Sequence, residues 1–332
     1  MTENATPAEI RWGILATGGI ARLFTKDLIA HGHTVSAVGS RSHEAASAFA
    51  TAHGIPRAHG SYEALAADPE VDVVYVATPH TLHAENALLA LEHGKHVLVE
   101  KAFTLNEKEA VTVTEEARRR GLVVMEAMWT RFLPHMHHVR GLLADGRIGA
   151  VRSVQAEHAQ LLPFGDDHRL RDPNLGGGAL LDLGVYPISF LHDVAGEPEE
   201  VDARAVMTSR GVDASVATVS THPGGVLATT FSSMDVRGRN EATVLGAEGR
   251  IEIATTWYAP TTVTLRDEAG AMVEEFRADV TGRGMQYQAA EMERLIRTGA
   301  VGSDVMSPAA TVAVMRTMDR IRDCIGLRYS GD

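Results

Sequence analysis

Residues 11–21 read RWGILATGGIA, and this stretch decides the fold class. An apolar run at 12–15 leads into a glycine pair that begins at Gly18, and a helical pattern follows directly. In the dinucleotide-binding βαβ unit, such glycines let the backbone turn tightly and approach a pyrophosphate at the helix N-terminus. Ala16 replaces the first glycine of the G-x-G-x-x-G/A pattern, whereas Gly18 and Ala21 match its remaining positions. The residues that we expect to hold the phosphates are Thr17, Gly18, Gly19 and Ile20.

Short apolar runs alternate with helical patterns from residue 11 to about residue 126. The runs do not alternate polar with apolar residues, which is typical of strands buried on both faces of a parallel sheet. They lie at residues 12–15, 35–39, 73–77, 97–99 and 122–125. The helical stretches between them include residues 44–53, 82–93 and 107–120. This order predicts right-handed crossovers and a doubly wound parallel sheet, the Rossmann architecture, over residues 8–128.

The pattern changes in residues 129–332, where apolar residues recur with a period of two. Such strands predict a largely antiparallel sheet with one exposed face. The expected strands lie at residues 151–161, 201–209, 215–221, 226–232, 241–245 and 250–253. The expected helices lie at residues 134–145, 286–298 and 307–325. The sequence thus predicts an α/β protein with a Rossmann domain and a C-terminal α+β domain on a large, mostly antiparallel open sheet, whose last helix can pack back on the first domain.

Composition excludes several classes of protein. The 332 residues are 45% hydrophobic, and 31 basic against 43 acidic side chains give a net charge of −12. That balance argues against nucleic-acid and anionic-membrane partners, which bind basic surfaces. Cys324 is the single cysteine, so an internal disulfide or a cysteine metal site is excluded. The sequence has no export signal and no run of about 18 apolar residues, so we expect a cytoplasmic protein.

The end of the second expected strand should select the dinucleotide. NAD binding uses an acidic residue about 20 positions beyond the glycines, at the ribose hydroxyls. This sequence has Ser40-Arg41-Ser42 there and no acid before Glu44. A guanidinium forks onto phosphate oxygens and stacks on adenine, so Ser40 and Arg41 predict the 2′-phosphate of NADP, with NAD the weaker cofactor. The alternative is a solvated surface arginine.

Five further stretches carry a resemblance to a known family. They are VATPH (76–80), VEKA (99–102), EAMWTRF (126–132), GGGALLDLGVY (176–186) and MDRIR (318–322). Together with the glycine loop, they resemble the glucose–fructose oxidoreductase/inositol dehydrogenase (Gfo/Idh/MocA) family over nearly the whole chain. EAMWTRF and MDRIR further resemble the branch that contains dimeric dihydrodiol dehydrogenase and NADP-dependent D-xylose dehydrogenase. Besides Ala16, Ala102 departs from the family pattern, which usually has proline after the lysine.

Lys101, Asp182 and Tyr186 are the candidate catalytic residues. Lys101 ends a buried strand, where its ammonium can face the ligand crevice, although a solvated lysine paired with Glu100 fits the sequence equally well. Asp182 and Tyr186 are four residues apart, which places both on one helical face. Glycines before them allow a ligand to approach the backbone. In the alternative interpretation, Tyr186 is a core residue and Asp182 is a helix cap. The resemblance instead implies that both residues take part in catalysis.

Hydride transfer from a hydroxyl-bearing carbon also requires a proton to leave the oxygen. A free tyrosine, with a pKa of about 10, is a poor base at neutral pH. A nearby ammonium lowers that pKa, so we expect Tyr186 to transfer the proton and Lys101 to tune it and bind the reacting oxygen. Asp182 would orient the substrate or the lysine.

The resemblance also implies further contacts with cofactor and substrate. The remaining cofactor candidates are Thr78, Pro79, His80, His83, Glu100, Lys101, Trp129 and Arg131. The substrate candidates are Trp129, Phe164, Arg169, Asp182, Tyr186 and Trp257. Although the chain has 16 histidines, no third ligand accompanies pairs such as His135 and His138, and we predict no metal site.

These features predict an NADP-dependent oxidoreductase acting on a hydroxyl of a sugar, cyclitol or dihydrodiol. The alternatives are a keto-sugar reductase of the 1,5-anhydrofructose type and a non-catalytic NADP-binding sensor. The resemblance further implies a homodimer through the C-terminal sheet, with residues 226–232 and 243–245 as candidate interface strands.

Overall fold

The computed structural model describes residues 9–162, 165 and 167–329. They divide into two compact units. Unit 1 contains the described residues as far as Thr104, followed by residues 108–129 and 282–311. Unit 2 contains the described residues within 105–107, 130–281 and 312–329. The segment 282–311 therefore belongs to unit 1, although it follows the entire second sheet in the sequence.

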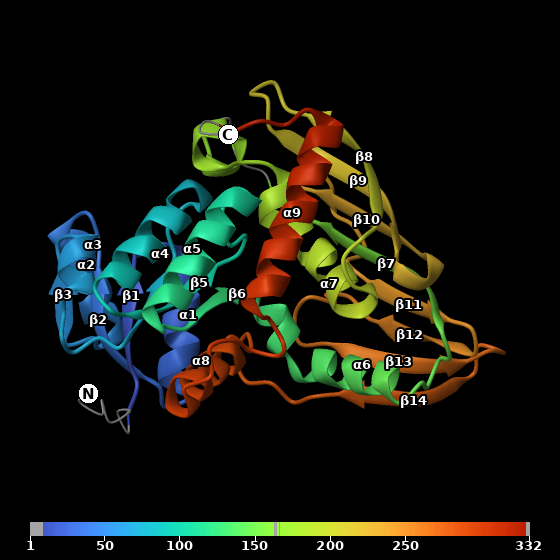
Figure 1. The fold of residues 1–332 in the computed structure, drawn as a ribbon, viewed down its shortest axis with the longest axis horizontal. Coiled ribbons are helices and arrows are strands. Elements are labelled where there is room, and N and C mark those ends of the chain that lie inside the picture. The colour runs from blue at the N-terminus through green and yellow to red at the C-terminus, as the bar shows by residue number, and fades with distance from the viewer. Residues whose placement is uncertain (1–8, 163–164, 166, 330–332) are drawn as a thin grey trace. The chain divides into compact units, whose positions relative to one another are not determined.

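A six-stranded parallel sheet forms the centre of unit 1. Its strands are β1 (Arg11–Leu15), β2 (Thr34–Gly39), β3 (Arg57–His59), β4 (Val73–Val76), β5 (His96–Glu100) and β6 (Val124–Ala127). Its helices are α1 (Gly19–Ala30), α2 (His43–His53), α3 (Tyr62–Ala66), α4 (His83–Glu92), α5 (Glu107–Arg120) and α8 (Gln286–Thr298). The strand order β3-β2-β1-β4-β5-β6 is that of the doubly wound dinucleotide fold (Figure 1). The expected Rossmann architecture is confirmed.

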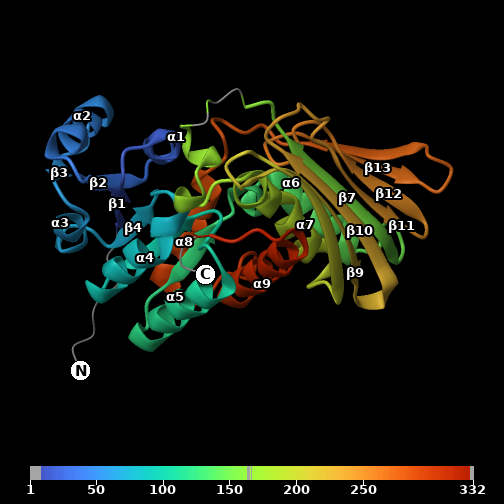
Figure 2. The same ribbon diagram turned by 90° about the horizontal axis from the view of Figure 1, so that it is seen from above.

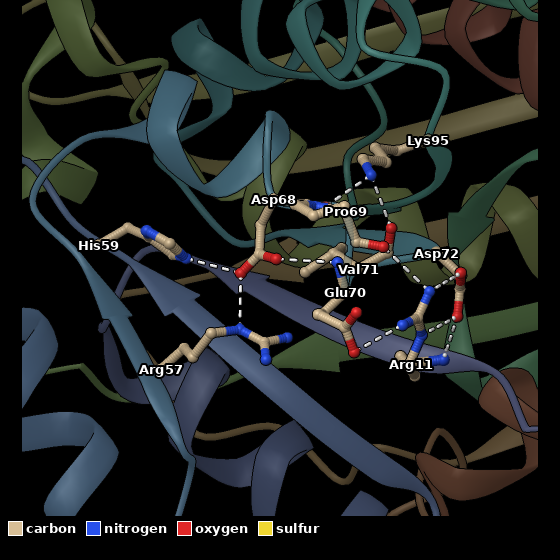
Figure 3. A network of polar contacts seen from close by, with 9 residues as sticks. All are labelled: Arg11, Arg57, His59, Asp68, Pro69, Glu70, Val71, Asp72 and Lys95. Atoms are coloured by element: carbon tan, nitrogen blue, oxygen red, sulfur yellow. Dashed lines mark hydrogen bonds and ion pairs between the residues drawn. The ribbon is translucent and has the colours of Figure 1, made fainter.

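Strand β3 was not expected, and a polar network explains why it forms (Figure 3). The carboxylate of Asp68 accepts a hydrogen bond from Arg57 and lies 2.8 Å from Nε2 of His59. The buried ammonium of Lys95 donates to the carbonyls of Asp68 and Val71 at 2.7 Å each. Charged hydrogen bonds, rather than a run of buried apolar side chains, hold this strand in place. Residues 57–59 therefore show no sequence pattern that predicts a strand.

An eight-stranded sheet forms the centre of unit 2, in the order β14-β13-β12-β11-β7-β10-β9-β8. All neighbours are antiparallel except β7 and β10, so the mostly antiparallel sheet is confirmed. Its strands are β7 (Val151–Ala159), β8 (Glu200–Met207), β9 (Asp213–His222), β10 (Val226–Ser233), β11 (Ala242–Gly246), β12 (Gly249–Ile253), β13 (Thr262–Asp267) and β14 (Met272–Arg277). Strands β13 and β14 were not predicted from the sequence, because they are short and partly exposed.

Helices cover one face of this sheet. Helices α6 (Pro134–Ala144) and α7 (Val185–Ala195) lie against it, whereas no helix among the described residues of unit 2 lies on the opposite face (Figure 2). The last helix, α9 (Pro308–Ile325), belongs mostly to unit 2. Within the described ranges, no helix combines the length and the apolar character needed to cross a bilayer.

Candidate active site

The start of helix α1 fits a phosphate group. The helix begins directly after Gly18, and no described side chain caps its first amides or places an acid in its first turn. A Cβ atom added to Gly18 or Gly19 would meet no described atom within 4 Å. The open amides and the helix dipole therefore leave both space and positive potential for an anion. Ala16 adopts a φ of 88°, the left-handed region in which a glycine costs less.

Arg41 lies beside a cavity in unit 1. The exposed Arg41 follows β2 and lines a cavity of about 760 Å³ together with residues from α3 and α4. Tyr62, from the first turn of α3, lines the same cavity and lies within hydrogen-bonding reach of Arg41. The volume falls in the range of cofactor pockets. Ser40 is nearly buried, whereas Ser42 caps α2 by accepting from the amide of Ala45.

His83 joins the loop after β4 to the loop after β5. Its Nε2 lies 2.8 Å from the carbonyl oxygen of Thr78, and its Nδ1 lies 2.8 Å from that of Ala102. Burial lowers the pKa of His83 to about 4, so the ring is neutral near pH 7 and donates to one of the two carbonyls. His80 packs edge-on against this ring. His83 thus fixes the backbone next to Lys101.

Lys101 is half-buried and follows β5 directly. The preceding carboxylate, Glu100, accepts a hydrogen bond from the hydroxyl of Tyr75 on β4. The peptide bond between Lys101 and Ala102 is cis.

The buried ring of Trp129 lies 5.2 Å from the guanidinium carbon of Arg283, a cation–π contact within unit 1.

Asp182 and Tyr186 lie at the start of one helix in unit 2. A π-helical turn over Leu180–Gly184 carries Asp182 and continues into α7, whose second residue is Tyr186. The carboxylate of Asp182 forms an ion pair with Arg169 at 3.2 Å. Tyr186 is only 7% exposed. Asp182 and Tyr186 therefore lie on two consecutive helical segments, and Arg169 contacts the first of them through its ion pair with Asp182.

Two rings that the sequence reading did not single out contact Tyr186. The His158 ring meets the Tyr186 ring edge-on with centroids 4.8 Å apart, and the Tyr258 ring lies 5.5 Å away. His158 is buried at a core-facing position of β7. The period-two pattern of this strand is the sequence feature that could have identified it. The sequence analysis predicted Trp257 as a substrate residue, but the ring that contacts Tyr186 belongs to its neighbour, Tyr258.

The glycines before Asp182 are explained by packing within the protein. A Cβ atom on Gly177 would lie 2.7 Å from the carbonyl oxygen of Leu170, and one on Gly178 would lie 2.1 Å from Oδ1 of Asp213. The Oδ2 atom of Asp213 accepts from the backbone amide of Leu180 at 2.6 Å. Asp213 therefore caps the element that carries Asp182, and Gly178 leaves room for its carboxyl group, whereas Gly177 leaves room for the backbone of Leu170.

Asp213 should make stability depend on pH. Burial raises its pKa from 3.8 to about 7, although the amides of Leu180 and Ala179 oppose this shift. Since folding raises the pKa, the stabilising contribution is present below about pH 4 and is lost as the pH rises through about 7. Between about pH 5 and about pH 8 this loss amounts to roughly 3 kcal/mol in the free energy of unfolding, and Asp213→Asn, which does not titrate, should remove it. Urea unfolding at about pH 5 and about pH 8 measures it.

A matched control for this variant is Asp202→Asn, which changes an exposed carboxylate on β8. It should keep the decline seen in the wild type. An Asp213→Asn protein that loses stability with pH as steeply as the wild type would contradict the assignment.

The remaining predicted site residues have varied surroundings. The buried guanidinium of Arg131 donates to the hydroxyl and the carbonyl of Ser189 and lies 3.8 Å from Asp193, so it anchors α7. Trp257 is fully buried, and its indole N–H donates to the carbonyl of Glu157 at 2.7 Å. Phe164 lies outside the described residues.

The histidines of α6 make structural contacts. Nε2 of His135 lies 3.0 Å from the carbonyl oxygen of Trp257, and burial lowers the pKa of His135 to about 4. The ring of His138 stacks on Phe276, with centroids 4.3 Å apart. Over the part of the chain that the structure describes, no three His, Cys, Asp or Glu side chains gather in a way that could hold a metal ion.

Comparisons with known proteins agree with this architecture. Residues 10–128 match the model of an oxidoreductase family with an NAD-binding Rossmann fold, and residues 136–252 match the GFO/IDH/MocA C-terminal domain. The chain is 35% identical to trans-1,2-dihydrobenzene-1,2-diol dehydrogenase of Bos taurus, over 97% of this chain and 99% of that protein. It is 34% identical to the NADP⁺-dependent D-xylose 1-dehydrogenase of Hypocrea jecorina, over 98% of this chain and 94% of that protein.

A solved structure shares the complete fold. A 3-ketoreductase from Actinomadura kijaniata, in complex with TDP-benzene and NADP, superimposes with a TM-score of 0.83. It is 28% identical in sequence, and the match covers 96% of this chain and 98% of that one. Since the matched family and relatives are dehydrogenases and reductases, this chain is an oxidoreductase. It belongs to the Gfo/Idh/MocA family.

Proposed function

We propose that this chain transfers hydride between NADP and a hydroxyl-bearing carbon of a sugar, cyclitol or dihydrodiol, with Tyr186 as the proton-transfer residue. One observation carries the proposal: a nearly buried phenol lies at the start of α7, one turn beyond the carboxylate of Asp182. The named activities of the relatives support the reaction type.

The proposed chemistry needs a hydride acceptor and a proton acceptor. When bound, the nicotinamide supplies hydride chemistry. Tyr186 takes the hydroxyl proton as the C–H bond breaks and returns it in the reverse reaction, so the same residues serve oxidation and reduction. The ammonium of Lys101 favours the phenolate and binds the reacting oxygen. The pair of Asp182 and Arg169 orients the substrate through its hydroxyl groups.

The residues of unit 1 would hold NADP. The amides at the start of α1, beside Gly18 and Gly19, would bind the pyrophosphate. Arg41 would bind the 2′-phosphate, while the adenosine occupies the neighbouring cavity. The complex of the Actinomadura 3-ketoreductase with NADP supports this cofactor.

A substrate panel tests the proposal. Purified protein is incubated with NADP⁺ and aldoses, cyclitols or trans-dihydrodiols, and with NADPH and keto-sugars, while the nicotinamide absorbance is followed. We expect turnover with at least one of these substrates. Tight NADPH binding without turnover across the panel would instead support a sensor, and turnover confined to the keto-sugars would support a dedicated reductase.

Arg41→Ala should weaken NADP binding selectively. Loss of a bidentate guanidinium–phosphate contact is expected to raise the Kd for NADPH roughly 10- to 100-fold, and loss of adenine stacking to raise the Kd for NADH only about 2- to 3-fold. Fluorescence titration with both cofactors measures this. Arg118→Ala, which changes an exposed arginine of α5, is the control. Equal weakening of NADH and NADPH would show that Arg41 does not select the cofactor.

The uncovered face of the second sheet supports a homodimer. It presents exposed apolar side chains, including Val219 and Leu227, and a depression of about 540 Å³ lined in part by Phe231. Light scattering at micromolar concentration should give twice the 35.6 kDa of one chain. Leu227→Glu is expected to produce monomers because it buries a charge in the interface. Val301→Glu, at an exposed site in unit 1, should leave the dimer intact. A wild-type protein that is monomeric in this measurement would contradict the proposed dimer.

A further inference from the structure

A buried carboxyl group lies behind the backbone that leads to Asp182. We call residues 176–182 the glycine segment, because it begins with three consecutive glycines. Asp213, at the start of β9, is fully buried, and its Oδ2 accepts from the amide of Leu180 at 2.6 Å. Within the described part of the chain, its Oδ1 has no hydrogen-bond partner. Asp213 thus holds the middle of the glycine segment while its own second oxygen stays unsatisfied.

Two further hydrogen bonds hold the glycine segment. The hydroxyl of Tyr329 donates to the carbonyl of Gly177 at 2.7 Å, and the amide of Gly178 donates to the carbonyl of Leu170 at 2.8 Å. Gly176 and Gly178 have φ values of 67° and 114°, a region open to glycine at little cost. The segment is therefore a short connection held by individual hydrogen bonds, with glycines at the positions where a backbone hinge is easiest.

The glycine segment sets the position of Asp182. This carboxylate lies two residues beyond Leu180, on the π-helical turn. Its side chain is 13% exposed, and that of its ion-pair partner Arg169 is 42% exposed. Tyr186 lies beyond the segment, in the first turn of α7. A movement of the segment therefore displaces Asp182 relative to Tyr186.

The hold of Asp213 on the segment depends on pH. Burial raises its pKa to about 7, so its charge changes near neutral pH. The charged groups on the neighbouring segments bind other partners: Asp182 binds Arg169, Arg171 binds Asp235, Asp172 binds the amide of Asn174, and Arg210 binds the carbonyl of Arg171. Among the described residues, no cationic side chain forms an ion pair with Asp213. The buried carboxylate can therefore regain solvation only if the backbone that covers it moves away.

We propose that Asp213 is a positioning residue: when protonated it keeps the glycine segment closed and Asp182 in place, and when ionised it opens the segment locally while the rest of unit 2 stays folded. The role of Asp182 in this inference rests on the proposed function. If opening restores the ordinary pKa of 3.8, the equilibrium constant for opening rises roughly 100-fold between about pH 5 and about pH 8.

Amide hydrogen exchange measures this opening. Peptides that cover the glycine segment should lose protection roughly 100-fold between about pH 5 and about pH 8, after correction for the intrinsic exchange rate. Their protection should be unchanged by about 1 M urea, because a local opening exposes little surface. Peptides from β10 should respond to urea, since they exchange through global unfolding.

Three variants separate the charge of Asp213 from the other contacts. Asp213→Asn keeps an acceptor for the amide of Leu180 but does not titrate, so its protection should not depend on pH. Asp202→Asn, the exposed control on β8, should keep the wild-type loss. Tyr329→Phe removes only the hydroxyl that holds Gly177. It should lower protection by roughly fivefold at both pH values and keep the pH-dependent loss.

Kinetics distinguish positioning from a purely structural role. With the best substrate of the panel, KM should rise at least about threefold more between about pH 6 and about pH 8 in the wild type than in Asp213→Asn. The Kd for NADPH should be the same in both proteins, because the residues proposed to hold NADP belong to unit 1.

A pH-dependent loss of protection that persists in Asp213→Asn, or a glycine segment that responds to urea as β10 does, would overturn the inference. An equal rise of KM in the two proteins would also overturn it, since the opening would then not reach Asp182. A wild type that turns over no panel substrate refutes the proposed function, and the positioning of Asp182 with it. Turnover together with a glycine segment whose protection ignores pH refutes the inference alone.

Discussion

Tyr186→Phe is expected to lower kcat by about 1,000-fold or more, while the Kd for NADPH stays within about twofold of the wild type. The substitution removes only the hydroxyl that would exchange the proton. The ring keeps its contacts with the rings of His158 and Tyr258, so the packing of α7 is preserved. Steady-state kinetics with the best panel substrate measure kcat, and fluorescence titration measures the Kd.

Tyr287→Phe provides the matched control, because Tyr287 is half-buried on α8 and has no place in the proposed chemistry. It should retain wild-type kcat. If Tyr186→Phe keeps more than about a tenth of the wild-type kcat, another group transfers the proton and the role assigned to Tyr186 is wrong.

Lys101→Met is expected to lower kcat/KM near pH 7 by about 100-fold and to move the low-pH limb of the pH–rate profile, where activity rises with pH, upward by at least about one pH unit. An ammonium favours a nearby phenolate, so its removal raises the pKa of the phenol. Oxidation then requires a higher pH to form the base. Profiles of kcat/KM against pH in the direction of alcohol oxidation measure the shift.

Two variants separate charge from structure at this position. Lys101→Arg keeps a positive charge, so its profile should stay near that of the wild type even if kcat falls. Lys108→Met removes an exposed ammonium from the first turn of α5 and should leave the profile unchanged. A Lys101→Met enzyme with reduced activity but an unshifted profile would show that Lys101 binds the substrate without tuning the base.

The fold of unit 1 could be predicted because its strands are continuous apolar runs. The runs that became β1, β4 and β5 are buried, and burial on both faces requires apolar side chains at successive positions. Strand β3 escaped prediction because the side chain of Asp68 and its ionic partners hold it in place. Such long-range charge contacts leave no periodicity in the sequence.

The site could be predicted only where spacing carries information. The four-residue interval from Asp182 to Tyr186 indicated a helical segment, and Asp182 does lie in the π-helical turn that continues into α7, with Tyr186 in the first turn of α7. Arg131 was named from its neighbours in the sequence, and only the structure shows that it bonds to Ser189. Asp213 gave no signal at all, since a lone carboxylate before a strand usually faces solvent.

The contact between Gly178 and Asp213 also constrains how this sequence can change over time. Position 178 has a φ of 114°, and a Cβ atom there would lie only 2.1 Å from Oδ1 of Asp213, so a side chain at 178 is strained even where residue 213 is shorter. A shorter residue at 213 in turn deprives the amide of Leu180 of its acceptor. Each position is therefore constrained by its own requirement. Sequences related to this one should keep glycine at 178 and a hydrogen-bond acceptor for the amide of residue 180 at 213.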